Sequence, residues 1–439
     1  MRQDDFFGLV DRLTTRLHHN EVLLCNLDGE DSDFVRLNGN RLRQAGSVHR
    51  RGLNLTLIQD QRQVEGGCDL AGEPDRDLAM ADGLLERLRK RLCQVPEDPY
   101  LSHSTEPTSS ERRVGAGVPE PAEVVEELIA AATGLDLVGI WASGPIFRGF
   151  ASSLGHRHWH QSASFNLDWS CYLENNKAIK ADFSGFAWEP ARLAQKLQTV
   201  RTSLEAMSRP ARTVKPGRYR AYLAPAAVQE LMDMLAWGGF GLKDHRTAQT
   251  PLLRLVRGER GLDARVGVYE DHARGLAPGF TPEGFIKPER VTLISDGAYR
   301  NCLVDSRSGK EFGVAINAGA EYPESLALDP GDIPSDEVLA RLGSGLYIGN
   351  LWYLNYADRN DCRITGMTRF GTFWVEDGEI LAPVNVMRFD DSLYHLLGDR
   401  FVGLTLEREL ILSADTYGGR STTSHLLPGL LVGGLELTL

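Results

Sequence analysis

The stretch SDFVRLNGNRLRQAGSVHRRGLNLTLIQD, residues 32–60, sets the architecture expected for the first half of the chain. Asn38 and Gly39 stand in the turn position between two runs of β-like residues, which is a strong signal for a β-hairpin. A second run, HRHWHQSASFNLDWSCYL at 156–173, alternates over its length and predicts a long, half-exposed strand pair. We therefore expect the first half to contain an antiparallel sheet.

Apolar residues at helical spacing predict four helices in the same half. Their apolar stripes begin at Phe6, Leu84, Val124 and Leu193. Residues 95–120 differ from these segments because they are rich in Pro, Ser, Thr and Glu. That composition is typical of a surface connector.

The main domain boundary is expected at 208–220, SRPARTVKPGRYR, where two prolines, a glycine and several basic residues interrupt the apolar periodicity. After it come a strand, a helix that begins at Pro225, and many short β-like runs. No βαβ alternation is long enough to predict a doubly wound parallel sheet. We expect an α+β protein of two domains: a mixed helix and antiparallel-sheet domain at 1–209, and a β-rich domain with a few helices at 210–439.

Composition excludes several classes of protein. The 439 residues include 48 Lys and Arg against 60 Asp and Glu, a net charge of −12. This balance argues against a protein that grips nucleic acid or an anionic membrane surface, since both use clustered basic residues. No apolar run approaches the roughly 18 residues that span a bilayer. The six cysteines form no C-x-x-C pair, so we expect a cytoplasmic protein with reduced thiols.

The densest group of possible metal ligands is His156, His158 and His160. Alternate residues of a strand share one face, so these imidazoles would project together and could bind zinc, with Asp168 as a further ligand. The alternative is an exposed strand face without a metal, and we favour it because the cluster contains no acidic residue for acid–base chemistry. No P-loop, dinucleotide fingerprint, nucleophile elbow or H-E-x-x-H motif occurs.

The acidic segment EYPESLALDPGDIPSD, at 321–336, has widely spaced acidic residues and is broken by prolines. We interpret it as a solvated loop in preference to a cation site.

The order of segments resembles the TldD/PmbA family over nearly the whole chain. The resemblance is carried by the Pro-Gly-aromatic strand and helix KPGRYRAYLAPAAVQELMDML (215–235), by Thr365-Gly366, by the turn Asp377-Gly378-Glu379, and by the close SHLLPGLLVGGLELTL. Family members of the TldD-like branch carry H-E-x-x-x-H on that helix and a cysteine near the C-terminus. The resemblance implies that these groups bind zinc and that the Glu of the motif acts as general base. Here the helix has no histidine and residues 424–434 have no cysteine. The chain is therefore similar to the PmbA (TldE) branch, which lacks the zinc motif.

The resemblance implies a non-catalytic subunit, with no catalytic residue and no cofactor of its own, in a zinc peptidase complex. Its partner would be a TldD-like subunit that bears H-E-x-x-x-H and the zinc, and together they would mature or degrade peptides and unfolded polypeptides. Such substrates bind as an added strand at a sheet edge. Candidate groove residues are Thr365, Gly366, Phe370 and Gly371. The alternatives are a metal hydrolase that uses the three histidines, and a homodimeric binding or scaffold protein.

Overall fold

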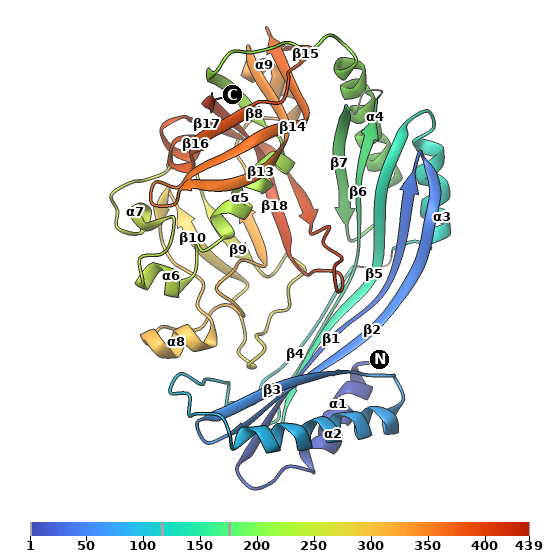
Figure 1. The fold of residues 1–439 in the computed structure, drawn as a ribbon, viewed down its shortest axis with the longest axis vertical. Helices are drawn as coiled ribbons and strands as arrows, with labels where there is room; N and C mark the ends of the chain where they lie inside the picture. Colours follow the sequence, from blue (N-terminus) through green and yellow to red (C-terminus); the bar gives the residue numbers. More distant parts are fainter. Residues whose placement is uncertain (1, 116–117, 174–176, 439) are drawn as a thin grey trace.

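The computed structural model describes residues 2–115, 118–173 and 177–438. It is an α+β structure with a two-domain layout, as expected. Figure 1 shows long, twisted strands of the first half running between two pairs of helices, with the second half packed beside them. Among the described residues, no helix is both long enough and apolar enough to cross a membrane.

The N-terminal sheet has the strand order β3-β2-β1-β5-β6-β4, and β7 also pairs with β6. The predicted hairpin is present: β1 and β2 pair antiparallel along their length. Gly39 and Asn40 make the turn with φ of 59° and 53°, the left-handed conformations that a two-residue hairpin needs. The strands are β1 (Glu21–Asn38), β2 (Arg41–Gln59), β3 (Arg62–Asp69), β5 (Asp136–Ser152), β6 (Arg157–Tyr172) and β7 (Ala178–Gly185).

All four helices predicted for the first half are present, and each buries its apolar stripe. Helices α1 and α2 cover one end of the sheet and enclose a core with the leucines of β1 and β2. Helices α3 and α4 enclose a second core at the other end, around Trp141, Phe165 and Trp169. Their bounds are α1 (Gln3–Thr14), α2 (Pro74–Leu92), α3 (Pro121–Ala131) and α4 (Pro190–Met207).

The segment expected to be a surface connector, 95–120, is more ordered than its composition suggests. It contains β4 (Ser109–Val114), which pairs in parallel with the start of β6. Most of the β4 side chains remain exposed or half-buried, so the strand is added to the sheet by backbone hydrogen bonds and not by an apolar face. Residues 116–117 of the segment lie outside the described residues.

The C-terminal sheet closes on itself. Its path runs β11-β10-β9-β12-β18-β16-β14-β13-β8, and β18 pairs with β8 as well as with β16. The enclosed core includes Leu231 and Met232 of α5. The remaining elements are β8 (Gly217–Leu223), α5 (Pro225–Ala236), α6 (Leu242–Arg246), α7 (Leu253–Val256), β9 (Val268–Asp271), β10 (Arg290–Ser295), β11 (Ala298–Tyr299), α8 (Ser306–Phe312), β12 (Ser325–Leu328), η2 (Ser335–Glu337), α9 (Val338–Leu342), β13 (Gly345–Asp358), β14 (Arg363–Glu376), β15 (Glu379–Pro383), β16 (Arg388–Ser392), η3 (His395–Asp399), β17 (Phe401–Leu412) and β18 (Ser424–Leu437).

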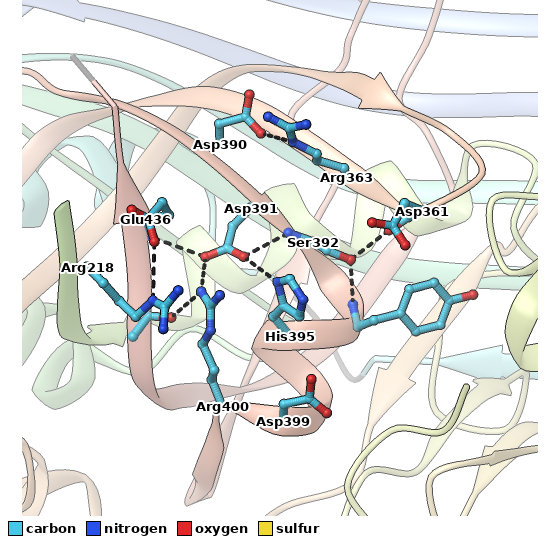
Figure 2. A network of polar contacts seen from close by, with 12 residues as sticks. Arg218, Asp361, Arg363, Asp390, Asp391, Ser392, His395, Asp399, Arg400 and Glu436 are labelled. Atoms are coloured by element: carbon cyan, nitrogen blue, oxygen red, sulfur yellow. Dashed lines mark hydrogen bonds and ion pairs between the residues drawn. The ribbon is translucent and has the colours of Figure 1, made fainter. Parts of the chain in front are cut away.

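A polar network beside this closure is centred on the buried carboxylate of Asp391 (Figure 2). Oδ1 of Asp391 accepts a hydrogen bond from the backbone N–H of Ser392 at 2.9 Å and lies 3.0 Å from Nδ1 of His395. Oδ2 accepts from Arg400 at 2.7 Å and from the backbone N–H of Glu436 at 3.0 Å. One side chain thus ties together β16, η3 and the C-terminal strand β18.

Two arginines join the halves of the molecule. Arg420, in the loop before β18, is buried and donates to the carbonyls of Gly144 at 2.9 Å and Ser164 at 3.0 Å in the N-terminal sheet. Arg112 of β4 donates in the opposite direction, to the carbonyls of His272 and Ala273. Because both guanidinium groups bond to backbone atoms, the two sheets are held in a defined relation at this junction.

Candidate functional site: a groove between the two sheets

A groove of about 730 Å³ lies where the two halves meet. Its volume is in the range of ligand-binding clefts. Strands β1, β2 and β3 form one wall, with Asn26, Asn54 and Thr56 among the lining residues, and C-terminal loops form the other. The opposite wall includes Pro278, Phe280, Pro282, Glu283, Tyr322 and Glu324.

Strand β3 gives this groove an unpaired sheet edge. In the described part of the chain, β3 pairs only with β2, and Gly66 and Gly67 of β3 line the groove. A free edge presents backbone N–H and C=O groups to an added strand, and glycine allows another backbone to approach closely. The groove could therefore take an extended peptide by strand addition.

Next to the groove, the structure brings together three potential ligands that the sequence analysis did not select. Glu270 and His272 leave the end of β9 two residues apart, and Glu324 immediately precedes the neighbouring strand β12. One ligand atom from each of the three lies within 4.8 Å of the others. Glu324 also lines the groove, and the residues that follow it form the fully buried strand β12, so the expectation of a solvated loop at 321–336 is wrong at this point. The spacing Glu-x-His on a strand was the available sequence signal.

Burial controls the charges of this cluster. Burial, reinforced by the nearby Glu324, raises the pKa of Glu270 to about 8. Burial and the neighbouring Lys287 lower the pKa of His272 to about 4, so its imidazole is neutral near pH 7. Nζ of the buried Lys287 lies 2.6 Å from Oε2 of Glu324 and forms an ion pair with it.

Helix α5, which corresponds to the motif helix of the resemblance, holds no cluster of metal ligands. Its polar face presents Gln229 and Glu230 to a small cavity of about 110 Å³. The next polar residue, Asp233, pairs with His425 of β18 at 3.1 Å between Oδ1 and Nε2. Among the described residues, the one group of three close ligands is Glu270, His272 and Glu324. The residues on and around α5 therefore do not fit the zinc site of TldD-like proteins.

His158 and His160 on β6, and His156 directly before it, share a face. We expected this face to be exposed, but it is buried. Each ring nitrogen of His156 and His158 lies within hydrogen-bond distance of a Ser or Thr hydroxyl. His160 places Nε2 2.9 Å from the carbonyl of Leu276. Asp168, the further ligand considered, instead pairs with Lys180. Apart from Nδ1 of His160, which has no partner, every ring nitrogen of these buried histidines has a hydrogen-bond partner, so the arrangement does not favour a metal hydrolase built on them.

The four residues proposed from the sequence to line a peptide groove lie elsewhere. Thr365 and Gly366 are in the middle of β14, paired with β13 on one side and β16 on the other, so they offer no free edge. Phe370 and Gly371 have positive φ and sit at a break in the β13 pairing. A Cβ on Gly371 would lie 3.3 Å from Ile179 of the N-terminal half. None of the four lines the groove.

Several solved structures have the same fold as this chain. The solved structures that it resembles include a protein from Thermotoga maritima described as a candidate modulator of a DNA gyrase, at 17% identity and a TM-score of 0.76 over 99% of this chain and 100% of the other. TldE from Thermococcus kodakarensis matches at 15% identity and a TM-score of 0.75, over 99% of this chain and 100% of the other. A second protein described as a candidate gyrase modulator, from Bacteroides thetaiotaomicron, matches at 16% identity and a TM-score of 0.74, over 99% of this chain and 98% of the other. A comparison with curated proteins found no match.

The fold defines a two-domain α+β protein. The family described as the PmbA/TldA metallopeptidase C-terminal domain matches residues 216–438, which is slightly more than half of the chain. The chain belongs to the PmbA/TldD family.

Proposed function

We propose that this chain is the non-catalytic subunit of a PmbA/TldD-type zinc peptidase complex. The observation that carries the proposal is helix α5, where Gln229, Glu230 and Asp233 stand on the polar face and no histidine is available. Its sequence thus groups it with the TldE-like branch. A TldD-like partner would supply the zinc and its general base, and this chain would help to hold the substrate.

The substrate class follows from the groove. An unpaired edge at β3 and a wall that carries two prolines and a phenylalanine suit an extended peptide that is recognised mainly through its backbone. We do not propose a role on DNA, because the net charge of −12 opposes binding to phosphates.

The direct test measures peptide cleavage by the purified chain alone and after mixing with a TldD-like chain that bears H-E-x-x-x-H. We expect no turnover by the isolated chain, a stable heterodimer on mixing, and turnover that disappears when a histidine of the partner's motif is replaced. Peptidase activity of the isolated chain would overturn the proposal. A folded chain that forms only homodimers and captures no TldD-like subunit would favour the scaffold alternative.

Filling the groove should impair the complex. Thr56→Trp places a large ring against the groove and is expected to lower kcat/KM for a peptide by about tenfold or more, equivalent to about 1.4 kcal/mol of lost binding. Ser47→Trp is the matched control, since Ser47 is exposed on the same strand and does not line the groove. Equal activity of the two variants, both in folded complexes, would place peptide binding elsewhere.

A further inference from the structure

We propose that Glu270, His272 and Glu324 form a binding site for one divalent transition-metal ion, separate from any zinc of a TldD-like partner. The site is built from two adjacent antiparallel strands of the closed C-terminal sheet. Glu270 lies on β9, His272 directly follows this strand, and Glu324 directly precedes β12. Their three ligand atoms already lie within 4.8 Å of one another.

The hydrogen bonds of His272 determine which nitrogen is free. Nδ1 lies 2.8 Å from the carbonyl oxygen of Pro288, which can only accept, so Nδ1 carries the proton and donates. In a neutral imidazole, Nε2 is then left with its lone pair. This nitrogen has no hydrogen-bond donor and faces Oε1 of Glu270 at 3.4 Å. A metal-bound histidine usually donates a hydrogen bond from its other ring nitrogen to a carbonyl or carboxylate, as Nδ1 does here, and this bond fixes the ring's orientation.

Glu270 leaves a second polar atom without a partner. Its Oε1 accepts the backbone N–H groups of Glu324 at 3.0 Å and Ser325 at 2.7 Å, which fix the carboxylate in place. Its Oε2 has no hydrogen-bond partner, although the residue is only 1% exposed. Buried polar atoms normally have partners. A metal ion between Oε2 of Glu270 and Nε2 of His272 would satisfy both orphaned atoms at once.

The charges and access of the site also suit a cation. When both are ionised, the two carboxylates carry two negative charges, and Lys287 places one positive charge beside Oε2 of Glu324. The guanidinium of Arg112 is also near, but it donates to the backbone carbonyls of His272 and Ala273 and not to either carboxylate. One imidazole with two carboxylates is a donor set for Zn²⁺ or Mn²⁺ in preference to Ca²⁺ or Mg²⁺, which take oxygen ligands. Glu324 lines the groove, so an ion can enter from that side.

The experiment titrates the full-length chain, stripped with a chelator, with Zn²⁺ and separately with Mn²⁺, by calorimetry. We expect one equivalent of at least one metal to bind and to raise Tm. Glu270→Gln and His272→Gln should each weaken metal binding by about 100-fold or more, because the loss of a group that only supports a ligand already weakens binding by up to about 100-fold. Lys287→Met should retain the site, because Lys287 is not a ligand.

Glu283→Gln is the matched control, because Glu283 also has an unpartnered buried oxygen beside the groove but no histidine ligand. It should bind the metal as the unmodified chain does. The proposal is overturned if the folded chain binds neither metal. It is equally overturned if binding survives in folded His272→Gln protein, or if His158→Gln removes it instead. None of these outcomes depends on peptide cleavage, so they leave the proposed function to its own test.

Discussion

Replacement of Asp391 by alanine is expected to lower the free energy of unfolding by about 3–5 kcal/mol, the range measured when one partner of a buried ion pair is removed. Asp391 is 3% exposed, and its two oxygens receive hydrogen bonds from Arg400 and from the backbone N–H groups of Ser392 and Glu436 (Figure 2). Alanine would leave the half-buried guanidinium of Arg400 only a 3.5 Å contact with the carbonyl of Gly434, and would leave two backbone N–H groups without this acceptor. It would also remove the side-chain link between β16 and the C-terminal strand β18, which would then be joined only by their backbone pairing.

Urea denaturation followed by tryptophan fluorescence measures this effect. Asp399→Ala is the matched control, because Asp399 lies near the same network (Figure 2) but is exposed, and its ion pair with Arg260 spans 3.6 Å. Exposed pairs contribute about 0–1 kcal/mol, so the control should remain near the stability of the unmodified chain. A loss for Asp391→Ala no larger than that of Asp399→Ala would show that the network does not support the closed sheet.

The parts of this fold that were predictable are those that depend on local sequence. Helices α1 to α4 follow from apolar spacing, because each buries a single stripe whose residues are three or four positions apart. The β1–β2 hairpin was predictable from Asn38-Gly39, although the turn lies one residue later: Gly39 and Asn40 take the left-handed backbone conformation, and Asn38 ends β1. The family follows from the order of several weak motifs along the chain.

The groove and its neighbouring cluster depend on contacts that no local pattern contains. Glu324 meets Glu270 from 54 positions away, because β12 and β9 pair antiparallel. Thr365 and Gly366 were predicted to line a groove because glycine permits close approach. The space beside Gly366 is filled by the side chains of Phe389 and Leu354 of the same sheet, and the free edge that borders the groove is that of β3.

The burial of the histidine strand was missed for the same reason. Three of the four hydroxyls that bond to its rings come from Ser104, Thr108 and Ser110, within the segment that was expected to be a plain connector, and the fourth is that of Ser152 on β5. A further covering group, Phe280, belongs to the other half of the chain and stacks on His158 with ring centroids 5.2 Å apart. Alternation identified the face, but only the tertiary structure could show what lies against it.

This buried face should make the protein sensitive to acid. Burial lowers the pKa of both His158 and His160 to about 4, against about 6.5 for an exposed histidine. Between these values the unfolded chain binds protons that the folded chain does not, so stability is lost as the pH falls from about 6.5 to about 4. By linkage, each of these histidines lowers the free energy of unfolding by about 3 kcal/mol when the pH has fallen to about 4.

The test compares unfolding free energies of the unmodified chain and of His158→Gln across pH 4 to 7. At pH 7 the variant should be the less stable, since it loses the bond to Ser110 at 2.8 Å and the stacking on Phe280. As the pH falls, its deficit should shrink by about 3 kcal/mol, because glutamine does not titrate. His19→Gln is the control, since His19 is exposed, and its curve should follow the unmodified chain. Parallel curves for His158→Gln and the unmodified chain would mean that the pKa of His158 is the same in the folded and the unfolded chain, and would contradict the prediction.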